Sequence, residues 1–425
     1  MFNINPRTLA LLDQCIVSGS GFLTLVILGR FLGAPEFGLF SLAMLATIFL
    51  ANLHRAVFTQ PMNVLGAGEP AAQSATRLRQ VLGAHLLAIP LSMALLGAVS
   101  FWFFPDPPLL LACCAYLSCF FLQETARRFW YTRQKMARAL CSDAISYGGQ
   151  LLLLLAAGLF WRLDGPSAFL IMAATSLLAF VVDVIAGGLL ARAQTHTGNM
   201  LAAHWAMSKW LVLTVLAVWG ATQLFPFLLA PLGAATVAAF VACRNLLNVI
   251  NVLTQTIGDF LPVRAALLLR QQGRDALRKH LTKSMLQCLV AGSVFLLVMI
   301  LVAEPLLDLV YKGLYNEAAG VLVILAIGRF FSLFAITLGA YSHAMQDARA
   351  SFIANIGATL SNATVGLWLI KTNGAAGAAW AATLGMLVAT MIQAVLVRAT
   401  WRKLPHAAHA PTPVQAVATF AGGGR

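Results

Sequence analysis

Long blocks of apolar residues recur along nearly the whole chain. A helix needs about 20 consecutive apolar residues to cross the hydrocarbon core of a bilayer. Hydrophobic residues make up 60% of the sequence and charged residues only 10%, and the mean hydropathy is +0.83. A soluble domain cannot bury that much apolar surface. The sequence therefore predicts a membrane protein that crosses the bilayer many times.

Twelve membrane spans can be placed on the apolar blocks. The first block is too long for the core of a cleavable signal and contains Asp13 and Gln14, so we interpret it as a retained span. The twelve predicted spans cover roughly residues 8–32, 37–61, 80–104, 108–131, 139–161, 167–191, 209–231, 234–262, 284–303, 318–344, 351–370 and 375–397.

The distribution of basic residues predicts the orientation of these spans. With the N-terminus placed in the cytoplasm, 21 of the 28 Lys and Arg residues fall on the cytoplasmic side, four fall on the outer side, and Arg55, Arg244 and Arg329 lie deep within spans. This asymmetry predicts that both termini are cytoplasmic. It also explains the net charge of +14 through topology and anionic lipid, so we expect no nucleic-acid partner.

The loop near the middle of the chain predicts two halves. We expect an N-terminal lobe of six spans at 1–195, a cytoplasmic loop at 196–208, a C-terminal lobe of six spans at 209–397 and a disordered tail at 398–425. Polar residues on spans of both halves favour a shared central cavity, an arrangement that is typical of transporters built from repeats.

One polar stripe follows the predicted eighth span. Steps of three and four residues keep its members on one face of a helix, and these members are Arg244, Asn248, Asn251, Gln255 and Asp259. Such a stripe either lines a polar passage or joins helices through hydrogen bonds. The second span carries a similar stripe that includes Asn52 and Arg55.

The three deep arginines predict an anion site. A guanidinium stays charged in a low dielectric and binds phosphate oxygens in a bidentate manner. The alternative is that Arg55, Arg244 and Arg329 pair with buried acids. Glu124 and Arg128 are predicted to pair with each other, four residues apart on one helix. The candidates for acids that respond to a coupling ion are Asp13, Asp143 and Asp183.

Motifs of enzymes are absent from the sequence. It has no phosphate loop of the G-x-x-x-x-G-K-[ST] type, and no H-E-x-x-H or G-x-S-x-G. We therefore expect a protein that is not an enzyme, does not hydrolyse ATP, and binds neither a cofactor nor a metal.

Four stretches, at 28–40 (LGRFLGAPEFGLF), 304–313 (EPLLDLVYKG), 346–349 (QDAR) and 374–379 (GAAGAA), resemble the bacterial polysaccharide exporters of the Wzx type. These exporters belong to the MOP superfamily, together with the MATE antiporters and the lipid II flippase. The resemblance implies twelve helices in two six-helix lobes around a cationic cavity. Arginines on the second and eighth spans, here Arg55 and Arg244, are similar to those of the lipid II flippase.

The resemblance also implies a function. An undecaprenyl-diphosphate-linked oligosaccharide would pass from the cytoplasmic to the periplasmic leaflet of the bacterial inner membrane by alternating access. The expected partners are this substrate, membrane lipids, a polysaccharide polymerase and a chain-length regulator, with H⁺ or Na⁺ as the open alternatives for coupling. A MATE-type antiporter of small molecules and a membrane-embedded enzyme that processes polysaccharide are the alternative functions.

Overall fold

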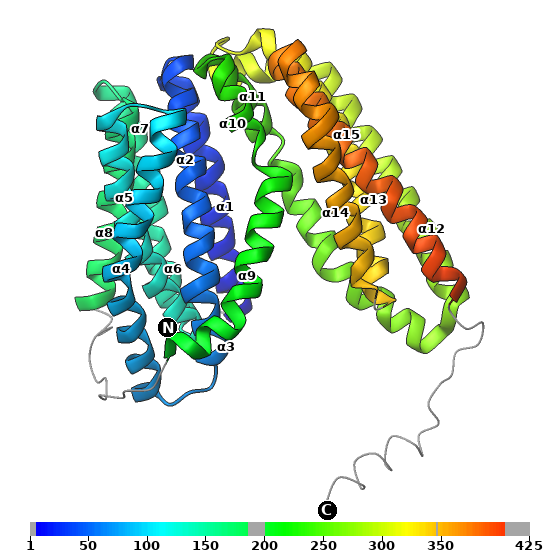
Figure 1. Cartoon of the computed structure of the whole chain (residues 1–425), viewed down its shortest axis with the longest axis horizontal. Helices are drawn as coiled ribbons and strands as arrows, with labels where there is room; N and C mark the ends of the chain where they lie inside the picture. Colours follow the sequence, from blue (N-terminus) through cyan, green and yellow to red (C-terminus); the bar gives the residue numbers. More distant parts are fainter. Residues whose placement is uncertain (1–5, 186–199, 346, 404–425) are drawn as a thin grey trace, which may run out of the picture. The chain divides into compact units, whose positions relative to one another are not determined.

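The computed structural model describes residues 6–185, 200–345 and 347–403, and over these residues the chain is helical without a strand (Figure 1). The chain divides into two compact units. Unit 1 comprises Met1–Leu246 and Leu306–Ala318, and unit 2 comprises Leu247–Pro305 and Ala319–Arg425. The predicted lobes, with their boundary at 196–208, stay a prediction.

Unit 1 contains most of the helices. They are α1 (Pro6–Phe31), α2 (Ala34–His54), η1 (Arg55–Thr59), α3 (Gln60–Leu65), α4 (Ala71–Phe103), α5 (Pro107–Thr132), α6 (Met136–Asp143), η2 (Ala144–Gly148), α7 (Gly149–Phe160), α8 (Gly165–Ile185), α9 (Met200–Thr222), α10 (Phe225–Leu229), η3 (Ala230–Leu232), α11 (Ala234–Leu246) and η4 (Asn316–Ala318).

Unit 2 is built from long helices, namely most of α12 (Val249–Tyr311), α13 (Ala319–Ala344), α14 (Ala348–Ser361), η5 (Asn362–Gly366) and α15 (Leu367–Lys403). Two of them are sharply kinked at a glycine. Gly273 in α12 has φ 77°, and Gly374 in α15 has φ 54°. Glycine adopts this left-handed conformation without a steric penalty, so each kink divides one long helix into two that can fold back on the bundle.

The all-helical membrane fold that the sequence predicts is confirmed. In the described part of the chain, nine helices are long and apolar enough to cross a membrane, or ten if the bent pair His204–Gly220 and Phe225–Leu232 is one span. One of the nine, Arg349–Arg402, contains two of the predicted spans, separated by Gly374. Large apolar side chains are exposed on the surface of the helices. Leu86, Leu87 and Trp102 are 80%, 81% and 78% exposed, as expected for residues that face lipid.

The predicted eighth span is not one helix. α11 ends at Leu246, residues 247 and 248 form a turn, and α12 begins at Val249. The polar stripe predicted from Arg244 to Asp259 is therefore interrupted after its first member, because a turn resets the helical phase. The charged segment at 264–283, which lies between the predicted spans 234–262 and 284–303, is helical on both sides of Gly273.

A π-helical turn, η1, interrupts the second span at Arg55. Pro61 follows closely and has no N–H to donate to the carbonyl of Val57 four residues earlier. Ser208 of α9 donates its hydroxyl to this carbonyl at 3.1 Å. Single π-turns often mark functional sites, and Arg55 is the first residue of this one.

Two glycines allow helices to approach closely. A Cβ on Gly38 would lie 1.8 Å from the carbonyl oxygen of Ala234, so α2 and α11 touch backbone to backbone. A Cβ on Gly377 would lie 1.9 Å from the carbonyl oxygen of Leu369. The small-residue runs of the sequence therefore serve close packing.

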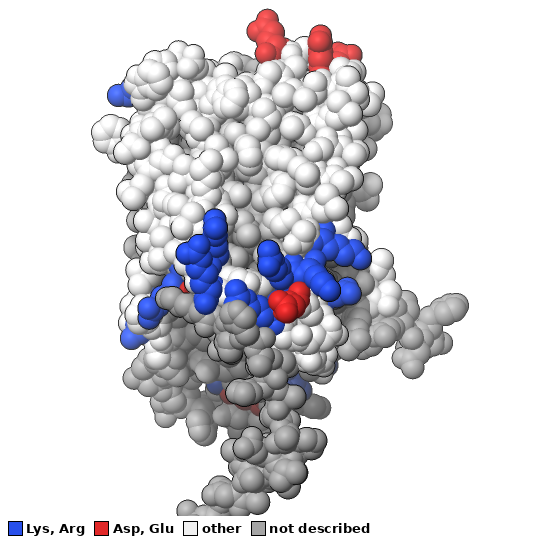
Figure 2. Space-filling model, turned by 90° about the vertical axis from the view of Figure 1, so that its right-hand side faces the viewer, with Lys and Arg blue, Asp and Glu red and all other residues white. Residues whose placement is uncertain are grey.

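Charged side chains are separated along the face of the molecule that Figure 2 displays. Most of the basic side chains seen there form one band that also contains an acidic group, an uncharged belt lies beside it, and further acidic side chains lie at the opposite end. The exposed basic residues of unit 2 that the structure describes fall mainly within 264–283 and 398–402. This pattern agrees with a belt in the bilayer and a basic border on one side.

Candidate functional site

A cluster of buried charges lies inside unit 1, where α1, α5 and α6 pack together. Arg127 of α5 is at its centre, and its guanidinium lies 3.4 Å from Asp13 Oδ2, 3.1 Å from Glu124 Oε2 and 2.6 Å from Asp143 Oδ2. The contact with Asp143 is an ion pair without hydrogen-bond geometry, because the Arg127 Nε–H is not directed at that oxygen. Arg127 thus neutralises carboxylates from three helices.

Glu124 extends the cluster toward its edge. Its Oε1 accepts hydrogen bonds from Arg55 Nη2 at 3.2 Å and from Arg128 Nε at 2.7 Å. Arg127 and Arg128 follow Glu124 by three and four residues, so α5 presents all three on one face. The predicted pairing of Glu124 with Arg128 is confirmed, and Arg55 is ion-paired with Glu124.

Exposure decides which member of the cluster a ligand can reach. Three carboxylates face three guanidiniums, so the formal charges balance. The Arg127 side chain is 6% exposed, that of Arg128 is 22% exposed and that of Arg55 is 45% exposed. Arg55 can therefore bind an anion while it keeps its contact with Glu124, whereas Arg127 is confined to the interior. Asn52, one helical turn before Arg55, is half-buried.

Neutral donors also bind the two aspartates. The Tyr131 hydroxyl donates to Asp13 Oδ2, and Gln123 Nε2 donates to Asp143 Oδ1 at 3.2 Å. The other oxygen of Asp13, Oδ1, is buried and has no hydrogen-bond partner among the described residues. A buried carboxylate oxygen without a partner is costly, and a proton or a small cation would satisfy it.

Asp183 lies apart from this cluster. Its two oxygens accept hydrogen bonds from Trp130 Nε1 and from the Ser142 hydroxyl, both at 2.8 Å. These bonds join α5, α6 and α8. The structure thus brings together two of the three aspartates predicted from the sequence and gives the third a different, fully bonded environment.

Arg244 is the predicted site residue at the end of α11. It is half-buried in unit 1 and donates to the side-chain oxygen of Gln223. The next residue, Asn245, is buried and donates to the carbonyl of Phe22 at 3.2 Å and to the Tyr311 hydroxyl at 3.4 Å. These contacts hold the end of α11 against α1 and thereby fix the backbone position of Arg244.

Unit 2 holds the remaining predicted residues. Arg329 lies ten residues into α13, is half-buried, and has no carboxylate within ion-pair distance in the described part of the chain. Asn248 is half-buried in the turn that precedes α12. The backbone of Asn251 and Gln255 lies in α12, but their side chains are outside the described residues. For Arg329, the alternative of pairing with a buried acid thus finds no support among the described residues.

Two histidines form a buried pair next to the cluster, which the sequence did not predict. The Nε2 atoms of His54 and His85 are 2.8 Å apart, and His85 Nδ1 donates to the carbonyl of Val81 at 2.6 Å. In the neutral pair, His54 Nε2 is therefore the donor and His85 Nε2 the acceptor. His54 Nδ1 then has no partner among the described residues.

Comparison with known families and solved structures agrees with the fold. A model of the MatE family matches residues 211–368. Among solved structures, an inward-facing multidrug resistance MATE transporter of the MOP superfamily has a TM-score of 0.72 at 13% identity, with 94% of this chain and 99% of that chain covered. Among curated proteins, no sequence matches this chain.

Two further structures show the range of this fold. The lipid II flippase MurJ in an inward closed conformation has a TM-score of 0.68 at 13% identity, with 92% of this chain and 89% of that chain covered. A MOP superfamily transporter from Pyrococcus furiosus has a TM-score of 0.58 at 11% identity, with coverage of 93% and 94%. The chain is a multi-pass membrane protein with the fold of MOP superfamily transporters. The fold is shared by flippases and by drug transporters.

Proposed function

We propose that this chain moves an undecaprenyl-diphosphate-linked oligosaccharide from the cytoplasmic to the periplasmic leaflet of the bacterial inner membrane. The observation that carries this proposal is the charge of the accessible polar residues. Arg55 is 45% exposed at the edge of a neutral cluster, and Arg329 has no acidic partner among the described residues. Both are suited to a ligand with a negative charge.

The energetic reason lies in the position of Arg329. An arginine in the middle of a membrane span costs about 2.5–3.5 kcal/mol on insertion scales, and such residues face protein or water and mark functional sites. A diphosphate group would offset that cost through bidentate hydrogen bonds. A site for organic cations would need acidic groups in that place, whereas the acids of the cluster in unit 1 are already neutralised by arginines.

Each predicted site residue has a role in this proposal. Arg55, Arg244 and Arg329 bind the diphosphate, and the amides of Asn52, Asn248, Asn251 and Gln255 replace the hydration of the sugars. Asp13 and Asp143 respond to H⁺ or Na⁺, because Asp13 Oδ1 has no described partner and both aspartates share Arg127. Asp183 is structural. Alternating opening of the lobes predicted at 1–195 and 209–397 completes the cycle.

The location of the cycle follows from the same proposal. The chain acts as a transporter and not as an enzyme, both termini lie in the cytoplasm, and the product passes to a polysaccharide polymerase and a chain-length regulator. The basic band of Figure 2 would mark the cytoplasmic side.

A second candidate is a MATE-type antiporter of small molecules. The MatE family model over residues 211–368 and the likeness to MATE structures favour it. The two candidates differ in the charge of the ligand. For the Pyrococcus furiosus transporter, a reversed polarity of the binding pocket suggests a different function, so a change of pocket charge within this fold has a precedent.

Binding of undecaprenyl diphosphate to the purified chain tests the proposal. We expect Arg329→Ala and Arg55→Ala each to weaken binding about tenfold or more, because a charged hydrogen bond contributes about 1.5–3 kcal/mol. Arg162→Ala, which removes an exposed arginine between α7 and α8, is the matched control and should bind normally. Normal binding by both Arg329→Ala and Arg55→Ala, or tighter binding of an organic cation such as ethidium, would overturn the proposal.

A further inference from the structure

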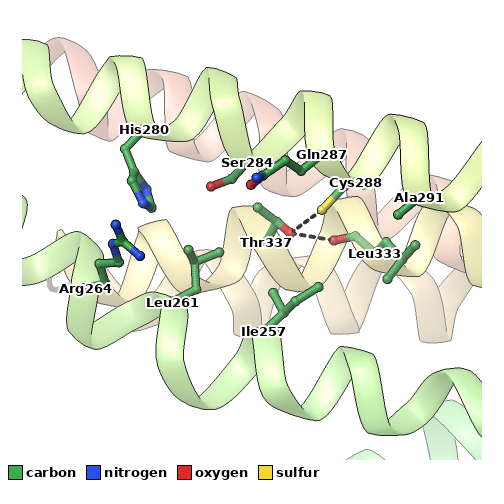
Figure 3. A pocket seen from close by; sticks show the side chains of 10 residues that line it. All are labelled: Ile257, Leu261, Arg264, His280, Ser284, Gln287, Cys288, Ala291, Leu333 and Thr337. Atoms are coloured by element: carbon green, nitrogen blue, oxygen red, sulfur yellow. Dashed lines mark hydrogen bonds between the residues drawn. The ribbon is translucent and has the colours of Figure 1, made fainter.

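A cavity of about 360 Å³ lies within unit 2, between the two parts of α12 and α13 (Figure 3). This volume falls in the range of small-molecule sites, about 300–1,000 Å³. The cavity belongs to unit 2, and its described lining includes none of the predicted site residues, while the side chains of Asn251 and Gln255 lie outside the described residues.

One end of the cavity is cationic. Arg264 and His280 point toward each other there, as Figure 3 shows. Lys283 lies close enough to His280 for its charge to act on the imidazole. In the described part of the chain, no carboxylate lies within ion-pair distance of Arg264. One ring nitrogen of His280, Nδ1, contacts the Tyr341 hydroxyl, which fixes the direction of the ring.

The rest of the cavity is largely apolar. Its inner wall is formed by Ile257, Leu261, Ala291 and Leu333. Three polar groups of the wall are bonded within the protein: the Ser284 hydroxyl lies 3.1 Å from the Tyr341 hydroxyl, the Cys288 thiol lies 3.2 Å from Thr337 Oγ1, and Thr337 donates to the carbonyl of Leu333 at 2.8 Å. The Gln287 amide is exposed. Arg264 is thus the permanently charged group of the lining.

We propose that this cavity binds an amphiphile with a phosphate head group, specifically an anionic phospholipid of the leaflet that borders the basic band. Arg264 binds the phosphate and His280 donates a second hydrogen bond from Nε2, while an acyl chain lies along Ile257, Leu261 and Leu333. Basic pockets between membrane helices are suited to anionic head groups. Arg264 belongs to the basic segment at 264–283, and Figure 2 shows basic side chains gathered in one band. The test of this site does not depend on the proposed transport function, because bound lipid is measured without transport.

Native mass spectrometry of the purified full-length chain tests the site. Phosphatidylglycerol and phosphatidylcholine with the same acyl chains are the probes, and undecaprenyl phosphate is a third arm. We expect one phosphatidylglycerol to remain bound after removal of bulk lipid, with a preference over phosphatidylcholine of about fivefold, the effect of one basic side chain near an anionic lipid. Arg264→Gln should abolish this preference, and Ala291→Phe, which fills the cavity, should displace both lipids.

Arg398→Gln is the matched control, because Arg398 is exposed, basic and outside the cavity. It should retain the preference of the wild type. The proposal is overturned if Arg264→Gln and Arg398→Gln lose lipid equally, since that result describes a general basic surface. It is also overturned if undecaprenyl phosphate binds and phosphatidylglycerol does not compete with it. If Ala291→Phe is not monodisperse, Arg264→Gln against Arg398→Gln decides alone.

Discussion

Arg127 shows most clearly why single residues are hard to interpret from the sequence. It lies at the predicted cytoplasmic end of the span at 108–131, where a basic residue is typical, and nothing in the sequence indicates that it is buried. In the structure it neutralises carboxylates from α1, α5 and α6. The three carboxylates meet Arg127 through tertiary packing, and the spacing of these residues along the chain does not reveal that contact. The pair of Glu124 and Arg128 was predictable, because both lie on one helix.

The roles of Arg127 and Arg55 in stability should differ. Arg127→Ala leaves Asp13 and Asp143 buried without a guanidinium, and breaking a buried ion pair costs about 3–5 kcal/mol. We expect a strong loss of thermal stability in detergent for Arg127→Ala. Arg55→Ala should lose little, because Arg55 is 45% exposed and Glu124 keeps two arginines. Differential scanning fluorimetry measures both, and equal stability of the two variants would contradict the central position of Arg127.

Among the helices, hydropathy predicted where the spans lie but not where they break. The apolar blocks set the positions of the spans because the length of a crossing helix is fixed by the bilayer. The break between Leu246 and Val249 was not predictable, because neither residue of the turn, Leu247 or Asn248, is a glycine or a proline. The kinks at Gly273 and Gly374 leave a sequence signal, but each glycine is one of 33 in the chain.

The contact between α2 and α11 depends on Gly38. A Cβ at this position would lie 1.8 Å from the Ala234 carbonyl oxygen, so Gly38→Ala forces the two backbones apart. We expect a loss of monodisperse protein in fluorescence-detection size-exclusion chromatography. Gly33→Ala is the control, because a Cβ on Gly33 meets no atom within 4 Å and its φ is −62°. Similar profiles for both variants would show that the close approach is not required.

For the whole molecule, the asymmetry of charge predicts the orientation, and the likeness to solved structures gives the fold. Basic residues set topology through their position relative to the bilayer, so this property can be predicted from the sequence without a structure. Substrate choice is different, because flippases and drug transporters share the fold. In the proposed function it depends on a few side chains such as Arg55 and Arg329, and on which of them lack an acidic neighbour.

The orientation predicts which loops an impermeant thiol reagent can reach from outside. In a parent without the native cysteines, Leu314→Cys should be labelled in intact cells, because residue 314 follows α12 on the predicted outer side and is 46% exposed. Ala67→Cys, exposed between α3 and α4, should be labelled only after the membrane is permeabilised. The opposite labelling pattern would reverse the topology.

Transport in proteoliposomes tests the central claim most directly. The chain, reconstituted with a fluorescent undecaprenyl-diphosphate-linked oligosaccharide, should move the probe between leaflets, as measured by loss of protection from an added quencher. Arg329→Ala should slow this movement about tenfold or more, the effect of one lost charged hydrogen bond, and Arg162→Ala should leave it unchanged. If the wild type moves an organic cation such as ethidium and not the lipid-linked probe, an anion-transporting role is contradicted.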